Sequence, residues 1–318
     1  MLTLSGFLND QLGLAVVTDA LFVLLTIATL GYGYLRAYRP TPGMPKIGSR
    51  IAFLWWTMVM LVAALLYSYK VLILYIWLIA FLALKEYLSM TSTRRADRRV
   101  LFFAYLSLPI QFILILLEKR DIFVVFVPIH VFLVLPIIMV LSGETKGFLQ
   151  AWSMLGWGII TTVYSLGFLA YLLILPVEKN PTIGGSGLFI FLLGLAQLSH
   201  VAQFAFGKYF NDPRLSLKVS TTRNWASLVG SIIVNIPVAM LLAPWITPFG
   251  KLEAAIMGAI IAAGAFIGYI ILSAIKGDLN IKDRGTMTPG RGGILNRIDT
   301  FIYTAPLFYY LVNLLHFV

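Results

Sequence analysis

The amino-acid sequence predicts an all-α membrane protein, a polytopic bundle of about ten transmembrane helices. Of its 318 residues, 60% are hydrophobic and only 12% are charged, whereas soluble domains have about 45–50% and about 25%. Runs of about 20 mainly apolar residues recur along the whole chain, and each is long enough to cross a hydrocarbon core of about 30 Å as a helix. Because lipid offers the backbone no hydrogen bonds, such runs must be helical.

The spanning segments follow from these runs and from the polar residues between them. We place them at residues 12–35, 50–69, 71–85, 100–117, 121–141, 151–175, 184–206, 225–243, 252–275 and 299–317. The division between the second and third is the weakest, because only Tyr67, Ser68 and Lys70 interrupt the apolar run. We treat 1–146 as a set of N-terminal helices and 147–318 as a C-terminal part that carries two long polar loops, within one integral membrane unit.

The basic residues fall mainly on one side of this bundle. The alternation of spans puts 19 of the 24 Lys and Arg residues in one set of loops and the remaining five in the other. Because cytoplasmic loops carry the excess of Lys and Arg, the first set is predicted to be cytoplasmic and both termini to lie outside. The net charge of +11 therefore indicates contact with anionic lipid headgroups rather than with nucleic acid. The absence of cysteine excludes disulfides, thiolate zinc sites and cysteine nucleophiles.

Two of the predicted cytoplasmic loops are suited to phosphate groups. The first, residues 207–224, reads G-K-Y-F-N-D-P-R-L-S-L-K-V-S-T-T-R-N, and the second, residues 276–299, reads K-G-D-L-N-I-K-D-R-G-T-M-T-P-G-R-G-G-I-L-N-R-I-D. Glycine lets the backbone approach a phosphate closely, amides and hydroxyls donate hydrogen bonds, and Lys or Arg supplies charge. A basic loop can serve topology alone, but topology does not require the glycine-dense P-G-R-G-G of the second loop.

The seventh predicted span carries polar side chains, which are costly in lipid and are therefore candidates for function. Ser199, His200 and Gln203 lie near its end, and Ser199 and Gln203 are neighbours at i, i+4. His200 is a metal ligand, a proton carrier or a hydrogen-bonded packing residue, and a lone histidine in a helix is more often the last. The same alternatives hold for His130.

The second loop resembles the signature of the phosphatidate cytidylyltransferases, also called CDP-diacylglycerol synthases. That signature reads S-x-x-K-R, then K-D, then P-G-H-G-G, then D-R-x-D. The positions that match it in register are Ser273, Lys276, Lys282, Asp283, Pro289, Gly290, Gly292, Gly293, Arg297 and Asp299. The F-G-K at 206–208, the stretch 218–225 and the F-L-A-L-K-E-Y at 81–87 are also similar to family segments. The resemblance covers most of the chain and is strongest over residues 195–318.

The resemblance implies a reaction, partners and a location. The family converts CTP and phosphatidate into CDP-diacylglycerol and pyrophosphate, with divalent cations such as Mg²⁺ neutralising the phosphates. The implied partners are CTP, phosphatidate or another anionic phospholipid, and a second copy of the chain in a homodimer. The implied location is a bacterial inner (plasma) membrane, with both loops on the cytoplasmic side, which agrees with the side assigned from charge.

Several departures from the family pattern fall on the chemistry. His200 replaces an Asp before the F-G-K, Tyr269 replaces the Asp of a G-D pair, and Asn296 replaces the first Asp of D-R-x-D. The remaining replacements are Thr221, Thr222, Arg223 and Asn224 in the first loop and Gly277 and Arg291 in the second. The resemblance therefore implies a site that keeps its phosphate-binding residues better than its metal-binding carboxylates.

The resemblance assigns the candidate residues to three roles. The candidate catalytic residues are Asp283, Asp299 and Lys276. The candidate phosphate-binding residues are Lys218, Ser220, Arg223, Ser273, Lys282, Arg291, Gly292, Gly293 and Arg297. The candidate metal ligands are Asp299, Asp283 and Asn296, with His200 as a weak fourth.

Two functions remain open at the level of the sequence. In the first, the protein is an active synthase in which Asp283, Asp299 and Asp278 hold Mg²⁺ and Arg291 supplies part of the positive charge. In the second, it is a catalytically silent family member that needs no metal. It then binds an anionic phospholipid or a nucleotide and regulates or scaffolds a partner lipid enzyme.

Overall fold

The computed structural model describes most of the chain after residue 66. The described residues are 67–91, 98–141, 143, 145–175, 184–210, 216–217, 220–279 and 293–316, with single residues or short groups between 26 and 62. The first two predicted spans, 12–35 and 50–69, lie almost wholly outside this part.

Eight helices in the described part are long and apolar enough to cross a membrane, and they correspond to the last eight predicted spans. They are built from α3 (Tyr69–Met90), α4 (Arg98–Leu116), α5 (Arg120–Val125) with η2 (Phe126–Val131) and α6 (Phe132–Val140), α7 (Phe148–Ile159) with η3 (Ile160–Tyr164), α8 (Ser165–Tyr171) and η4 (Leu172–Ile174), α9 (Gly184–Tyr209), α10 (Trp225–Ile246), α11 (Lys251–Asp278), and α12 (Leu295–Ile298) with α13 (Phe301–His316). The protein is therefore an integral membrane protein with an all-α fold, as predicted.

The start of α3 settles the weakest division in the predicted topology. Ser68 has an extended backbone, with φ −174°, and its side chain accepts a hydrogen bond from the Lys70 N–H. The donor and acceptor are 3.2 Å apart. A serine in this position satisfies one of the free N–H groups at a helix start, so a helix begins within two residues of the predicted start of the third span.

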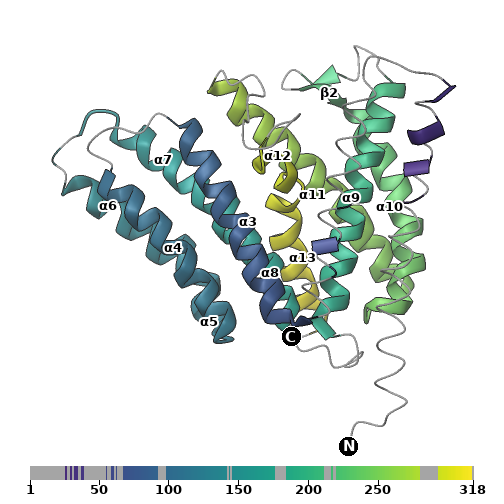
Figure 1. The fold of residues 1–318 in the computed structure, drawn as a ribbon, viewed down its shortest axis with the longest axis horizontal. Coiled ribbons are helices and arrows are strands. Elements are labelled where there is room, and N and C mark those ends of the chain that lie inside the picture. The colour runs from purple at the N-terminus through teal and green to yellow at the C-terminus, as the bar shows by residue number, and fades with distance from the viewer. Residues whose placement is uncertain are drawn as a thin grey trace, which may run out of the picture.

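The helices form two groups, and helix α13 lies between them (Figure 1). On one side α9, α10 and α11 pack against one another, and on the other α3 packs against α4, α7 and α8. Helix α13 joins the groups, because it packs against both α11 and α8. The short β1 (Ser216–Leu217) and β2 (Ser220–Asn224) pair antiparallel, and they lie at the same end of the bundle as α12 and the last turns of α11 (Figure 1).

Two glycines four residues apart let α13 approach α11 closely. A Cβ atom on Gly264 would lie 3.0 Å from Cγ2 of Thr304, and one on Gly268 would overlap the carbonyl oxygen of Asp299. This spacing is the small-xxx-small pattern that brings membrane helices together. The backbone at the break between α12 and α13 is therefore fixed directly against α11.

Candidate functional site

A buried arginine lies where three elements meet at this end of the bundle. Arg223, the penultimate residue of β2, is only 4% exposed. Its Nη2 atom is 3.1 Å from Nδ1 of His200 on α9. Its guanidinium carbon lies 4.1 Å from the centroid of the Tyr269 ring on α11, within the range of a cation–π interaction.

The chemistry of the guanidinium fixes the state of the histidine. A guanidinium has only donors, so Nδ1 of His200 must accept its hydrogen bond, and that nitrogen carries no proton. Burial lowers the pKa of the Arg223 guanidinium, while the negative charge of Asp299 and the Tyr269 phenol raise it. A charge buried this deeply is tolerated only with such partners.

Asp299 supplies the negative charge beside this arginine. It lies at the break between α12 and α13 and is 3% exposed. Its Oδ1 atom accepts a hydrogen bond of 2.7 Å from the N–H of Thr300. Its carboxylate also interacts electrostatically with Lys276 near the end of α11. The structure thus brings Arg223 of the first polar loop together with Lys276 and Asp299, the two ends of the second.

Helices α11 and α12 present further candidate residues at the same place. Tyr269, Ser273 and Lys276 recur at i, i+4 and i+7, so they share one face of α11. Ser273 and Lys276 are partly exposed, as are Asn296 and Arg297 on α12. These groups provide hydroxyl, amide and cationic donors at the same end of the bundle as Arg223, which suits a phosphate group.

Other candidates are not placed by the structure. Lys218, Lys282, Asp283, Arg291 and Gly292 lie outside the described residues, and only the backbone of Ser220 is described, as the first residue of β2. The structure therefore places the remaining candidates, which are Arg223, His200, Ser273, Lys276, Gly293, Asn296, Arg297 and Asp299.

The side chains in the described part are poorly suited as ligands for Mg²⁺. No group of three or more His, Cys, Asp and Glu side chains gathers there. A hard cation prefers several carboxylate oxygens, but Asp299 faces the charges of Arg223 and Lys276. His200 directs Nδ1 to the guanidinium rather than to an ion. The chemistry of this centre is therefore derived from its own side chains and not from a bound Mg²⁺.

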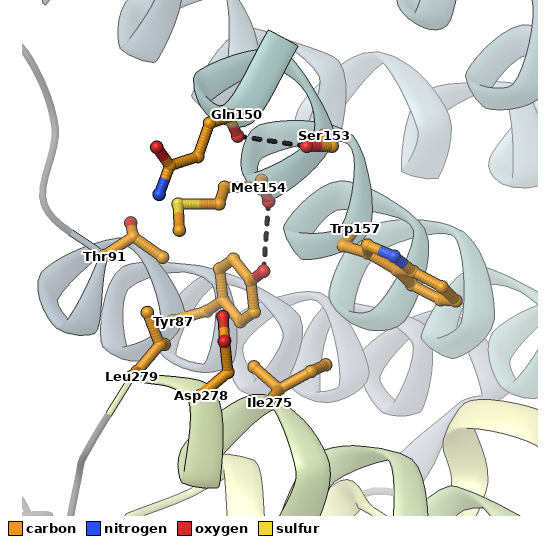
Figure 2. A pocket seen from close by; sticks show the side chains of 9 residues that line it. All are labelled: Tyr87, Thr91, Gln150, Ser153, Met154, Trp157, Ile275, Asp278 and Leu279. Carbon is orange, nitrogen blue, oxygen red and sulfur yellow. Dashed lines mark hydrogen bonds between the residues drawn. The ribbon is translucent and has the colours of Figure 1, made fainter. Parts of the chain in front are cut away.

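A separate cavity lies on another face of α11 (Figure 2). It has a volume of about 320 Å³ and is lined by Tyr87, Thr91, Gln150, Ser153, Met154, Trp157, Ile275, Asp278 and Leu279. The Tyr87 hydroxyl donates a hydrogen bond of 3.0 Å to the carbonyl of Met154, which joins α3 to α7 beside the cavity. Asp278, which the sequence offered as a third carboxylate, lines this cavity and is exposed.

A buried polar cluster links α9, α10 and α11. The Asn235 amide donates to Ser199 Oγ at 3.0 Å. The Gln203 amide donates to Ser231 Oγ at 3.4 Å and to the carbonyl of Ala262 at 3.1 Å. All four side chains are fully buried. In these contacts, the polar residues predicted near the end of the seventh span hold helices together.

Sequence reasoning missed Glu86, a buried carboxylate of α3 that contacts the backbone at Leu295. A signal was available, because Glu86 is an acidic residue at the end of a long apolar run, and such residues default to functional candidates. The structure shows that its partner is 209 residues away.

The fold and site together define a helical membrane protein with a phosphate-suited centre at one end of its bundle. A profile of the Cytidylyltransferase family matches residues 48–315. The chain belongs to this family, and the family recognised from the two polar loops is confirmed.

Three relatives illustrate the similarity. Uncharacterized protein YnbB of Escherichia coli (strain K12) is 34% identical over 294 residues, which cover 92% of this chain and 96% of that protein. A phosphatidate cytidylyltransferase of Synechocystis is 33% identical over 143 residues, 43% of this chain and 46% of the relative. Phosphatidate cytidylyltransferase 5, chloroplastic, of Arabidopsis thaliana is 31% identical over 168 residues, 51% and 41% of the two chains. The match thus spans less than half the length of the two relatives named as enzymes.

Proposed function

We propose that this protein is a phosphatidate cytidylyltransferase, which transfers the cytidylyl group of CTP to phosphatidate and releases pyrophosphate. The observation that carries the proposal is the buried Arg223, held between His200 and Tyr269 beside Asp299. Family membership and the names of the relatives support the same reaction.

The reaction is a displacement at phosphorus. An oxygen of the phosphatidate phosphate forms a bond to the α-phosphorus of CTP. The bond from that phosphorus to the bridging oxygen breaks, and pyrophosphate leaves with the electron pair. Because both reactants are anions, the site must offset their repulsion and orient them.

The roles of the described side chains differ with their exposure to solvent. Arg223 is nearly buried, so it acts mainly through its positive field, which is strong where water is excluded. Ser273, Lys276 and Arg297 are partly exposed and can donate directly to phosphate oxygens. The carboxylate of Asp299 interacts electrostatically with the two cations Arg223 and Lys276 and so helps to offset their charges at this end of the bundle.

A second function is favoured by one specific observation. His200 and Tyr269 stand where the family resemblance leads us to expect carboxylates, and both contact Arg223. In the part of the chain that the structure describes, this composition suits phosphate binding but offers few carboxylate ligands for a metal-assisted reaction. Such a protein binds phosphatidate or CTP but consumes neither.

The orientation and assembly are also proposals. The excess of Lys and Arg in the loops at the site end supports a cytoplasmic position for this end of the bundle, in a protein of a bacterial inner membrane. The family resemblance supports a homodimer. Labelling of single introduced cysteines in intact cells tests the first, and the molecular mass of the detergent-solubilised protein tests the second.

A labelling experiment with purified protein tests the reaction. Protein in detergent with phosphatidate receives CTP labelled either at the α-phosphate or at the γ-phosphate, with Mg²⁺, Mn²⁺ or no added divalent ion. A cytidylyltransferase transfers the α-label to lipid and releases the γ-label as pyrophosphate. Binding of CTP or phosphatidate without either product supports the silent alternative and contradicts the proposed reaction.

A further inference from the structure

Glu86 is a carboxylate buried inside a membrane-spanning helix. It lies in the last turns of α3 and is 5% exposed. Burying a carboxylate costs far more than burying a neutral side chain, unless the protein supplies hydrogen-bond donors. The hydroxyls of its neighbours Ser89 and Thr91 donate to carbonyls of α3 itself. Glu86 instead reaches across to another part of the chain.

The partner of Glu86 is the backbone that leads into α12. The Leu295 N–H donates to Oε2 of Glu86 over 3.3 Å. Gly293 lies against the same carboxylate, because a Cβ atom at that position would overlap Oε1, Oε2 and Cδ of Glu86. A side chain at this position would have to displace the Glu86 carboxylate, and Gly293 is the last glycine of the P-G-R-G-G run.

The short helix α12 is held at both ends by other helices. Glu86 of α3 fixes its start at Leu295. At its far end, the carbonyl of Asp299 rests against Gly268 of α11. Between these two anchors lie Asn296 and Arg297, and the carboxylate of the second anchor, Asp299, interacts electrostatically with Arg223.

We infer that Glu86 is a positioning residue for the site, which sets the place of α12 and thereby of Asp299 beside Arg223. The expected effect of Glu86 on turnover rests on the proposed function, whereas its expected effect on the position of α12 does not. Glu86 does not touch the reacting phosphates in this account. It acts through the backbone of residues 293–295.

The activity test compares Glu86→Ala, Glu86→Gln and the neighbouring control Ser89→Ala. Loss of the anchor displaces Asp299, so Glu86→Ala should lower kcat on the order of 100-fold. The KM for CTP should change by less than about threefold. Gln retains an oxygen that accepts from the Leu295 N–H, so Glu86→Gln should recover most of the rate, and Ser89→Ala should match wild type. If Glu86→Ala lowers only the yield or melting temperature while kcat per folded molecule is unchanged, the inference is wrong.

A double substitution tests the contact itself. Gly293→Ala alone should lower the melting temperature, because its methyl group meets the Glu86 carboxylate. In a Glu86→Ala background the carboxylate is gone, so Gly293→Ala should add little further loss. Additive losses would contradict the contact.

A distance measurement separates this inference from the proposed function. The sequence has no cysteine, so Asn296→Cys and Val229→Cys give two unique positions for spin labels, the second on an exposed site of α10. The distance between the labels should be narrowly distributed in the double-cysteine protein that keeps Glu86, and also when Glu86→Gln is added. It should become broad or shifted when Glu86→Ala is added. An unchanged distribution with Glu86→Ala overturns the inference. If the wild type consumes no CTP, the proposed function fails, yet this distance still decides the role of Glu86.

Discussion

The Nη2 atom of Arg223 lies 3.1 Å from Nδ1 of His200, and the Tyr269 ring stacks beneath the same guanidinium. All three residues are departures from the family pattern, and they come from β2, α9 and α11. Because they contact one another, the departures form one rebuilt centre rather than three separate losses. A planar guanidinium is matched by a neutral acceptor and an aromatic face, whereas Mg²⁺ prefers carboxylate oxygens.

The first prediction concerns the acceptor in this centre. Truncation in His200→Ala removes the acceptor for a buried guanidinium donor, so it should destabilise the fold by about 1–3 kcal/mol. Unfolding in mixed detergent and dodecyl sulfate measures this loss. The control is His130→Ala, because His130 is exposed and its contact with the Val125 carbonyl is long, at 3.4 Å. Equal stability of the two variants would show that the contact with His200 contributes nothing.

The second prediction concerns the close approach of α11 to Asp299. A methyl group in Gly268→Ala must displace the Asp299 carbonyl, which should cost about 1–3 kcal/mol of stability. Gly194→Ala on α9 is the matched control, because a Cβ there meets nothing within 4 Å. It should stay within about 0.5 kcal/mol of wild type. The idea fails if the Gly268 variant is as stable as the Gly194 variant.

The third prediction concerns the buried polar cluster. Asn235→Ala removes the donor to Ser199 and to the Ser231 carbonyl. Hydrogen bonds between membrane helices contribute about 0.6 kcal/mol on average and up to about 1.7 kcal/mol, so a loss in this range is expected. Val229→Ala, a truncation at an exposed position of the same helix, should lose less. A larger loss for Val229→Ala would contradict a role for the cluster.

Much of the fold could be predicted because lipid imposes a simple rule on sequence. Apolar runs gave the last eight spans, and the third span begins within two residues of its predicted start. The two π-helical segments η2 and η3 inside spanning helices were not predicted. Apolar length alone does not distinguish a π turn from an α turn, because both satisfy the backbone within the segment.

The site was predicted in part, for a different physical reason. Alignment with the family assigned Lys276 and Asp299 to the site as matching residues and Arg223 as a replacement, and the structure brings the three together. It did not show that His200 binds the guanidinium or that Glu86 anchors α12. Such contacts depend on how helices pack, and spacing along one helix cannot reveal a partner on another.

The most direct test of the central claim is CTP turnover by Arg223→Ala, compared with wild type and with Arg99→Ala. Arg99 is an exposed arginine at the start of α4, so its removal changes the net charge equally without touching the centre. If Arg223 supplies the positive field of the site, Arg223→Ala should lose at least about 100-fold in kcat/KM, and Arg99→Ala should retain the wild-type rate. Equal turnover by the two variants would contradict a site built on Arg223.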